Sequence, residues 1–429
     1  MLLSGAYSLE KSKILIYTIT NNNFYTRGSK MFSLLLAVIY LSFISLGLPD
    51  SLLGSAWPVM QTELGVPISY AGMLTMIIAG GTIISSLFSD RVIRRLSTGL
   101  VTAISVGMTA VALLGFSLAN SFWILCIIAI PYGLGAGAVD AALNNYVALH
   151  YSSRHMSWLH AFWGVGVSIS PSIMSFCLSR QYGWEAGYRS VFFIQICLVI
   201  ILFLTLSLWN KPGKNTDSTE EVVPKVLTIP QLIKLKGAPF VLVAFFCFCA
   251  LEATAGLWAS SYLVNFRLIK EETAAIFAAL FYLGETVGRF INGYTAEKYG
   301  DRAMIRTGII TIIIGTVLVA LPFGTNIITL IGLVVIGFGA APIYPCIIHS
   351  TPTNFGKEAS QSMVGIQMAS AYIGSTFVPP VFGLIAQYIN IGLYPAFLMA
   401  FAVLMLVMTE KLNKKICIPA ELYNDFVEK

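Results

Sequence analysis

Charged side chains are scarce in this sequence. Asp, Glu, Lys and Arg together make up 11% of its 429 residues, whereas about 25% is usual in soluble globular domains. A water-facing surface of this size needs more charge than that, so the scarcity excludes an ordinary soluble protein. Because 57% of the residues are hydrophobic, we expect the lipid bilayer to be the partner of this surface.

A cysteine framework and the common phosphate and metal motifs are also missing. The seven cysteines are an odd number, and six of them lie in apolar stretches, where we interpret them as small apolar residues. Neither Gly-x-x-x-x-Gly-Lys nor His-Glu-x-x-His occurs. We therefore expect no disulfide framework, no metal, no cofactor and no enzymatic activity. An integral membrane enzyme is the alternative from a different class, and the short polar loops argue against it.

Apolar residues occur in long continuous runs. A helix of about 20 apolar residues crosses the ~30 Å hydrocarbon core, whereas the strands of a membrane barrel alternate polar and apolar residues. The runs therefore predict an all-α integral membrane protein with twelve transmembrane helices. They lie near 31–60, 70–89, 98–119, 121–148, 157–178, 188–209, 239–264, 273–295, 303–323, 326–350, 359–387 and 391–410.

Basic residues are distributed unevenly between the two sides that these runs define. Of the 26 Lys and Arg, 21 are predicted on the same side as the N-terminus. Four are predicted on the opposite side, Arg180, Arg189, Arg267 and Lys270, and Arg289 lies inside a run. This bias follows the positive-inside rule. It predicts a multi-pass protein of the plasma (inner) membrane with both termini cytoplasmic, and it explains the net charge of +6 without a nucleic-acid partner.

The first 30 residues are expected to form a cytoplasmic tail, 1–30. Their segment KILIYTITNNNFY is short and interrupted by polar residues, and it lacks a small-residue cleavage site, so it is a poor signal peptide. Translation from Met1 and translation from Met31, directly before the first run, both remain open.

A polar gap divides the runs into six and six. Residues 210–237 are rich in Lys, Glu, Pro and Thr, as expected of a solvated linker. We predict an N-terminal six-helix bundle at 31–209, a central cytoplasmic loop at 210–238, a C-terminal six-helix bundle at 239–412 and a cytoplasmic tail at 413–429. The two halves repeat several features in the same order: Asp50 and Gly54 with Glu252 and Gly256, Gly133 and Gly135 with Gly337 and Gly339, and Gly166 and Pro171 with Gly374 and Pro379.

A charged cassette is a further repeated feature. SSLFSDRVIRR, residues 85–95, and NGYTAEKYGDR, residues 292–302, each interrupt the apolar pattern after the second run of their half. The matching residues are Asp90 with Glu297, Arg91 with Lys298, and Arg95 with Arg302. The repetition indicates that the chain is built from two related six-helix bundles.

The first cassette resembles the loop Gly-x-x-x-Asp-Arg-x-Gly-Arg-Arg of the major facilitator superfamily, whose transporters have two parallel repeats of six helices. Ser86 and Ile93 stand where glycines are usual, and the second cassette has Glu297 in place of Asp. The resemblance covers roughly 31–412 and implies a latch between the bundles on the cytoplasmic side. Its candidate residues are Asp90, Arg91, Arg94, Arg95, Glu297, Lys298 and Arg302. Alternatively, the arginines only anchor the topology.

Ionisable residues inside membrane helices are expensive, at roughly 2.5–3.5 kcal/mol or more each. Asp50, Asp140 and Glu252 are the candidates for proton coupling, since burial disfavours the charged form of a carboxylate. Asp50 shares a helical stripe with Gly47 and Gly54, and Asp140 shares one with glycines and Asn144. Small and amide neighbours favour a wet, cavity-facing surface, and the alternative is structural pairing with a neighbouring helix.

For two of the embedded acids, Glu285 and Glu252, ion pairing is a further question. Glu285 and Arg289 are four residues apart, a spacing that favours an intrahelical ion pair, so a structural role competes with a functional one. Glu252 has no charged neighbour one turn away. It is therefore either protonated or partnered by another helix.

Candidates for substrate binding are polar and aromatic residues near these acids. Trp57 and Trp258 each lie within seven residues of an embedded acid and could stack on a sugar ring, although tryptophans also form interfacial belts. His160 could shuttle protons or be a hydrogen-bonded core residue. The substrate-binding candidates are Trp57, Asn144, His160, Trp258 and Gln367.

Residues 133–171 are similar to the fucose–proton symporter branch of the superfamily. Asp140-x-Ala-x-Asn144 and His-Ala-Phe-Trp-Gly-x-Gly at 160–166 carry this similarity, which implies that Asp50 and Asp140 take part in proton coupling and substrate binding. We therefore predict a monomeric secondary transporter that takes up a small-molecule substrate, a sugar or similar polar solute, together with protons. A proton-driven efflux antiporter is the first alternative, and a transport-inactive nutrient receptor is the second.

Overall fold

Every regular element in the described part of the chain is helical. The computed structural model describes residues 34–67, 70–209, 227–269, 271–321 and 326–416. The tail expected at 1–30, Met31, most of the central loop and residues 417–429 of the C-terminal tail lie outside these ranges. The expected transmembrane helices are therefore compared with the structure over the described residues alone.

The N-terminal bundle begins with a helix at 34–50 that ends directly after Pro49 and Asp50. The helices that follow are α2 (Leu52–Glu63), α3 (Tyr70–Leu96), α4 (Thr98–Leu118), α5 (Phe122–His150), α6 (Ser153–Ser179), α7 (Gly183–Leu204) and the short α8 (Leu206–Trp209). The first helix and α2 form one membrane crossing with a break at Ser51. This break places Asp50 at an irregular point within the membrane.

The C-terminal bundle repeats this arrangement. Its helices are α10 (Ala238–Asn265), α11 (Glu271–Tyr299), α12 (Asp301–Ala320), α13 (Asn326–Ala340), α14 (Ile343–His349), α15 (Thr351–Phe355), α16 (Lys357–Ile385) and α17 (Tyr394–Ile416), with the irregular turns η1 (Ala386–Asn390) and η2 (Ile391–Leu393) between the last two. The run expected at 326–350 is divided into α13 and α14 at Pro342. Proline lacks the N–H that a continuous helix requires there.

The described residues supply enough long helices for the expected twelve crossings. Ten stretches meet the requirements for length and hydropathy. The last of them, Lys357–Ile416, contains both α16 and α17, and α11 is a further helix of 29 residues. The expected all-α membrane fold is thus confirmed.

Some boundaries differ from the apolar runs. Helix α7 begins at Gly183 and not near residue 188, because its first turn contains polar and aromatic residues that a hydropathy run excludes. Within the loop expected at 210–238, α9 (Ile229–Lys234) forms with Thr228 and Gln231 as a capping box, and its Leu232 is buried. Residues 413–416, expected in the C-terminal tail, continue α17.

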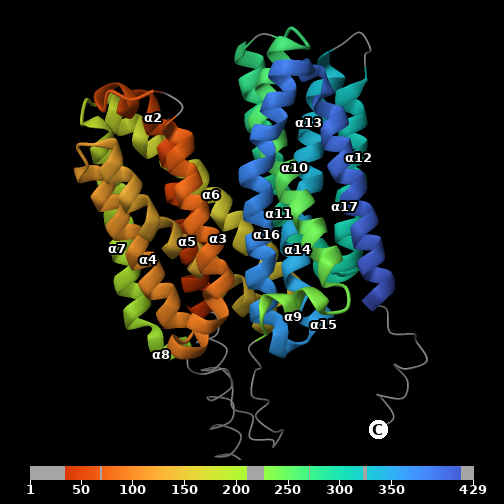
Figure 1. The fold of residues 1–429 in the computed structure, drawn as a ribbon, viewed down its shortest axis with the longest axis horizontal. Helices are drawn as coiled ribbons and strands as arrows, with labels where there is room; N and C mark the ends of the chain where they lie inside the picture. The colour runs from red at the N-terminus through yellow and green to blue at the C-terminus, as the bar shows by residue number, and fades with distance from the viewer. Residues whose placement is uncertain (1–33, 68–69, 210–226, 270, 322–325, 417–429) are drawn as a thin grey trace, which may run out of the picture.

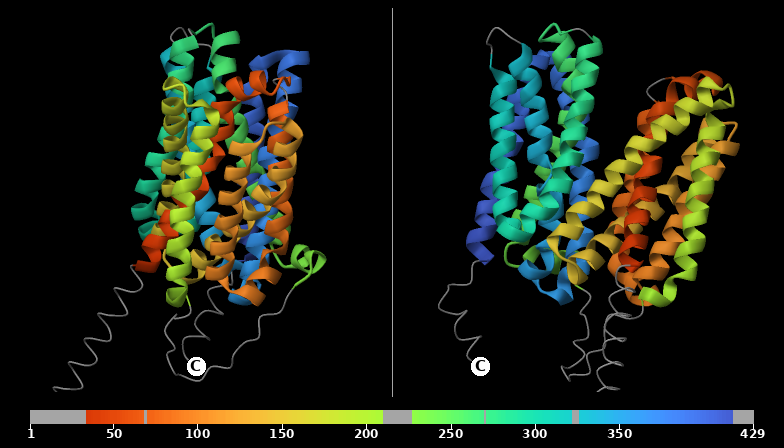
Figure 2. Two further views of the ribbon diagram at one scale, coloured as in Figure 1. Left: turned by 90° about the vertical axis from the view of Figure 1, so that its left-hand side faces the viewer. Right: turned by 180° about the vertical axis from the view of Figure 1, so that it is seen from behind.

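The two bundles converge at one end of the molecule. Figure 1 shows them apart at the end with η1 and α2, and together at the end with α8, α14 and α15, where the chain enters and leaves the bundles. Here we call the latter the terminal end. At this end α3 packs against α16, and α6, which runs obliquely in Figure 2, packs against α11.

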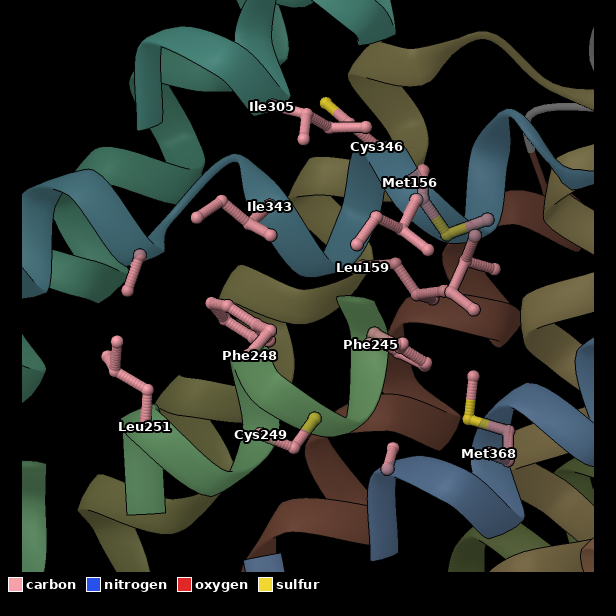
Figure 3. Packing of buried hydrophobic residues seen from close by; sticks show 14 of the residues in the cluster. Met156, Leu159, Phe245, Phe248, Cys249, Leu251, Ile305, Ile343, Cys346 and Met368 are labelled. Atoms are coloured by element: carbon pink, nitrogen blue, oxygen red, sulfur yellow. The ribbon is translucent and has the colours of Figure 1, made fainter. Parts of the chain in front are cut away.

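A continuous hydrophobic core joins the bundles near the terminal end. It includes Met156 and Leu159 of α6, Phe245 and Phe248 of α10, and Ile343 of α14, all fully buried. Figure 3 shows these side chains lying together. The core holds the helices that carry the polar groups of the cavity above it.

Candidate functional site

A cavity of about 710 Å³ lies between the bundles. Its wall includes Gly72 near the start of α3 and Pro379 near the end of α16, at the helix ends farthest from the terminal end (Figure 1). The cavity therefore opens on the side away from the chain termini. Its polar and aromatic wall includes Asp50, Tyr132, Asp140, His160, Trp163, Tyr188, Glu252, Arg289, Tyr344 and Tyr372.

Asp50 is held against α6. The indole N–H of Trp163 donates a 2.9 Å hydrogen bond to Asp50 Oδ2. One residue later, the Ser51 hydroxyl donates a 2.7 Å hydrogen bond to the carbonyl oxygen of Val167. The helices approach closely because residue 47 is glycine: a β-carbon there would overlap the Trp163 carbonyl oxygen. The expected cavity-facing position of Asp50 is thus what the structure shows.

Asp140 connects both bundles. The amide of Asn144, one turn later on α5, donates a 2.7 Å hydrogen bond to Asp140 Oδ1, and the Tyr372 hydroxyl of α16 donates a 2.6 Å hydrogen bond to Oδ2. His160 Nε2 lies 3.0 Å from Oδ1 of the same Asn144 side chain. Asp140 is 4% exposed, so these neutral partners supply most of its surroundings.

The glycines on the Asp140 stripe serve helix packing. A β-carbon at Gly133 would overlap the Ile78 carbonyl oxygen of α3, and one at Gly137 would overlap that of Thr82. Gly133 and Gly137 therefore allow close approach of α3 and α5. The approach brings α3 and α5 together beside the cavity.

Glu252, Arg289 and Glu285 form a buried ion-pair cluster. Arg289 Nη2 lies 3.2 Å from Glu252 Oε1 of α10 and also pairs with Glu285 of its own helix. Arg289 and Glu285 are each 3% exposed. The expected Glu285–Arg289 pair is present, and Glu252 has the partner from another helix that was one of its two expected states.

The ion-pair cluster also reaches the N-terminal bundle. The Arg289 guanidinium carbon lies 5.7 Å from the centre of the Trp163 ring, within the range of a cation–π interaction. Trp163 therefore contacts Asp50 through its N–H and Arg289 through its face. The two acids of the N-terminal bundle and the cluster of the C-terminal bundle thus share one cavity.

The terminal end is closed by contacts between the bundles. Asp90 accepts a 2.7 Å hydrogen bond from Arg94 of its own helix and another from the Ser362 hydroxyl of α16. Beside it, the Ser360 hydroxyl donates a 2.6 Å hydrogen bond to Asn145 of α5. The polar contact that Asp90 makes with the opposite bundle is thus to α16 and not to the second cassette.

The second cassette meets α6. Glu297 forms an ion pair with Arg154, whose side chain is 36% exposed. Other cassette residues have local contacts: Arg91 lies over the Phe88 ring and Lys298 over the Tyr299 ring. Arg95 is exposed, and Arg302 lines a small hollow beside Arg306 and Glu410. Asp90 of the first cassette and Glu297 of the second therefore each contact the opposite bundle, as does Asp301 of the second cassette, which accepts a hydrogen bond from Ser153 of α6.

The substrate-binding candidates divide into two groups. His160 lines the cavity, whereas Asn144, Trp57, Trp258 and Gln367 lie outside its wall. Trp57 is buried against Phe122, with ring centres 6.4 Å apart. Trp258 donates a 3.0 Å hydrogen bond to the carbonyl oxygen of Pro379, and Gln367 accepts one of 2.9 Å from Thr351.

The aromatic residues of the cavity wall include Trp163, Tyr344 and Tyr372. The sequence instead favours Trp57 and Trp258 as the aromatic residues that bind the substrate. Trp163 is far from an embedded acid along the chain, so proximity in sequence points to the other two tryptophans. Tyr372 follows no motif, and its partner Asp140 lies in the other bundle. Distance along the sequence could not reveal this contact.

The described residues contain no disulfide and no group of three or more side chains arranged to hold a metal. The cavity wall instead provides carboxylates beside hydroxyl, indole, imidazole and guanidinium groups. Such groups can exchange protons and form hydrogen bonds with a polar solute.

Comparisons with known proteins agree with this architecture. The model of the Major Facilitator Superfamily matches residues 39–269 and 269–415. Quinolone resistance protein NorA of Staphylococcus aureus is 25% identical over 389 residues, covering 88% of this chain and 95% of NorA. The glucose/mannose transporter GlcP of Bacillus subtilis is 20% identical over 364 residues, covering 83% and 88%.

Solved structures show the same fold. The E. coli fucose:proton symporter FucP aligns with a TM-score of 0.71 and 16% identity over 88% of this chain and 98% of its own. A structure of FucP in the outward conformation also aligns with a TM-score of 0.71. At such low identity the likeness concerns the arrangement of the helices.

Proposed function

This chain belongs to the major facilitator superfamily, and we propose that within it the protein imports a sugar or a similar small polar solute together with protons. It is a multi-pass membrane protein and a secondary transporter, not an enzyme. The proposal further places it in the plasma (inner) membrane as a monomer with both termini in the cytoplasm. The terminal end is then the cytoplasmic side, and the cavity faces outward.

The observation that carries the proposal is the contact between Asp140 and Tyr372. The Tyr372 hydroxyl joins the bundles by donating to an acid at the cavity wall. An ionised carboxylate can only accept hydrogen bonds, whereas a protonated carboxyl group can also donate one. Protonation of Asp140 changes which hydrogen bonds it makes with the opposite bundle, so the proton and the relative position of the bundles become linked.

Asp50 provides a second carboxylate at the same cavity. Its bond from Trp163 keeps it inside the N-terminal bundle, and Trp163 also lies against Arg289 of the C-terminal bundle. In the proposed cycle, one acid loads a proton while the cavity faces outward and releases it after the terminal end opens. The other acid holds the substrate or shares the proton.

The C-terminal wall is suited to hydroxyl groups. Glu252 offers acceptor oxygens, and Arg289 already has its charge balanced by Glu285. An anionic solute would meet three carboxylates in the cavity, Asp50 and Asp140 of the N-terminal bundle and Glu252 of the C-terminal bundle. A neutral polyhydroxylated solute avoids this repulsion and can stack on an aromatic ring such as Trp163.

Proton-driven efflux is the second candidate. The wall also carries Phe43, Phe116 and several tyrosines, which suit an aromatic, lipid-soluble compound as well as a sugar. NorA, a quinolone resistance protein by name, is among the similar proteins. A third candidate is a nutrient receptor that binds but does not move its ligand.

Ligand screening followed by flux measurements separates these functions. Purified protein is screened against sugars, nucleosides and amphipathic cations by thermal shift, since a ligand that binds the folded state raises its stability. The ligands found are then tested in proteoliposomes with an imposed proton gradient. Accumulation on the proton-receiving side supports import by symport, the reverse direction supports efflux, and binding without flux indicates a receptor.

A further inference from the structure

His349 and Asp301 form a polar cluster at the terminal end, outside the cavity wall. His349 is the last residue of α14, and Asp301 is the first residue of α12, both in the C-terminal bundle. His349 Nδ1 lies 2.6 Å from Asp301 Oδ2, and His349 Nε2 lies 3.2 Å from the Tyr151 carbonyl oxygen of the N-terminal bundle. The Ser153 hydroxyl of α6 donates a 2.5 Å hydrogen bond to Asp301 Oδ1.

Both ring nitrogens of His349 therefore face acceptors. A neutral imidazole has one N–H and one lone pair, whereas the charged ring has two N–H donors. With a neutral ring and an ionised Asp301, one nitrogen would direct its lone pair at an oxygen. The two short distances are both satisfied when the His349–Asp301 pair carries one additional proton, on the ring or between Nδ1 and Oδ2.

The helix ends around the pair favour the charged arrangement. Tyr151 follows the last residue of α5, where unpaired carbonyl groups give a partial negative charge that attracts a cation. Asp301 begins α12, where unpaired N–H groups give a partial positive charge that favours a carboxylate. A protonated His349 ring between these helix ends is attracted both to the carbonyl groups at the end of α5 and to the Asp301 carboxylate.

Other charged groups around α14 are engaged elsewhere. Arg154 of α6 pairs with Glu297, Arg306 of α12 pairs with Glu410, and Glu252 of α10 contacts Arg289. Helices α13 and α15 carry no titratable side chain in their sequences. The other titratable side chains on α14 and on the elements packed against it are Cys126, Tyr132, Asp140, Tyr146 and His150 of α5, His155, His160 and Cys177 of α6, Arg302 of α12, Cys247, Cys249 and Tyr262 of α10, and Tyr344 and Cys346 of α14 itself.

We propose that His349 and Asp301 bind a proton shared by the two bundles, and that this second proton site holds the terminal end closed. The site is separate from Asp50 and Asp140, and it acts whichever solute the protein moves. The His349 side chain is 21% exposed and that of Asp301 is 15% exposed, so the pair can exchange protons with the solution on that side. Acid on the terminal side therefore keeps the bundles together, and loss of the proton removes a hydrogen bond between them.

The linkage has a defined sign and upper limit. The closed form binds the proton more tightly than the open form, in which Tyr151 and Ser153 move away from the pair. One linked proton changes the ratio of closed to open forms by at most about tenfold per pH unit. The ratio rises as the pH falls.

The test measures the opening of the terminal end as a function of pH. Spin labels are placed at exposed positions 96 of α3 and 303 of α12 in a cysteine-free chain that also carries Asp50→Asn and Asp140→Asn, so that neither aspartate of the cavity titrates. Distances between the labels are measured by pulsed electron paramagnetic resonance in nanodiscs from pH 5 to 8. We expect the short distance to gain up to about tenfold in population per pH unit on acidification.

His349→Gln and Asp301→Asn should each make the distance distribution independent of pH. His150→Gln is the matched control, because His150 lies at the same end but its Nδ1 contacts Tyr146 of its own helix, and this variant should keep the full dependence. If His349→Gln does not fold, Asp301→Asn gives the same decision. The proposal is overturned if both variants keep the pH dependence, or if the parent chain shows none. Since Asp50 and Asp140 cannot titrate in this background, the result does not depend on whether either of them couples transport to protons.

Discussion

The Tyr372 hydroxyl donates a 2.6 Å hydrogen bond to Asp140 Oδ2, across the boundary between the two bundles. Tyr372 lies on α16 and Asp140 on α5, so the bond spans 232 residues of chain. Because Asp140 lines the cavity, a group accessible to solute and protons is directly bonded to the opposite bundle. This bond connects the chemistry of the cavity to the movement that alternating access requires.

The first prediction concerns Asp140. Asp140→Asn keeps the size of the side chain but removes its titration, so proton-driven accumulation in proteoliposomes should be lost while downhill exchange of the same solute persists. Asp50→Asn should either have the same effect or abolish substrate binding. If both variants still accumulate solute against its gradient, coupling lies elsewhere, with Glu252 as the next candidate, or the protein is a uniporter.

Arg289 should be needed for stability. Arg289→Gln leaves Glu252 and Glu285 buried together without their positive partner, and breaking a buried ion pair in this way costs about 3–5 kcal/mol. The thermal unfolding temperature of the purified protein should fall strongly. Adding Glu285→Gln removes one uncompensated acid and should recover part of the loss; a double variant no more stable than the single one would show that Glu285 is not ionised in the folded protein.

Gly133 should tolerate no side chain. In Gly133→Ala the new β-carbon overlaps the Ile78 carbonyl oxygen, and the backbone shift needed to relieve this costs about 1–3 kcal/mol. Gly54→Ala is the control, since no atom of the described residues lies within 4 Å of the position that its β-carbon would take. Thermal unfolding should separate the two variants, and equal stability would contradict the close packing of α3 against α5.

Asp90 should act on conformation and not on insertion. Asp90→Asn weakens the bonds to Arg94 and Ser362, so the closed terminal end should be less populated and transport should fall, with membrane insertion unchanged. Arg91→Gln is the control, because Arg91 contacts Phe88 of its own helix. Loss of insertion in Asp90→Asn would instead indicate that the loop only anchors topology.

The predicted orientation in the membrane rests on the charge bias alone. Asp217 belongs to the predicted central loop, outside the described residues. In Asp217→Cys the new thiol should resist labelling by an impermeant thiol reagent applied to intact cells. A reporter fused after Lys429 should behave as intracellular. Strong labelling of residue 217 from outside would overturn the predicted topology.

Local sequence was enough for the membrane helices and their division into two bundles. A transmembrane helix needs a long apolar run because lipid offers its backbone no hydrogen bonds, and that requirement is visible residue by residue. The Glu285–Arg289 pair was equally accessible, because residues four apart on a helix are neighbours whatever surrounds them. The embedded acids could be identified as functional candidates because a charge inside a membrane helix costs free energy. Of these, Asp50, Asp140 and Glu252 all line the cavity.

Contacts between the bundles depended on how the helices pack in space. Hydropathy and spacing do not tell which face of α16 meets α5, so Tyr372 was missed as the partner of Asp140, and Ser362 as that of Asp90. For the same reason Trp57, close to Asp50 along the chain, lies in the hydrophobic core, while Trp163 from another helix reaches the acid. His349, which pairs with Asp301 of its own bundle, meets Tyr151 only where the bundles close, because that contact is created by packing between the two halves.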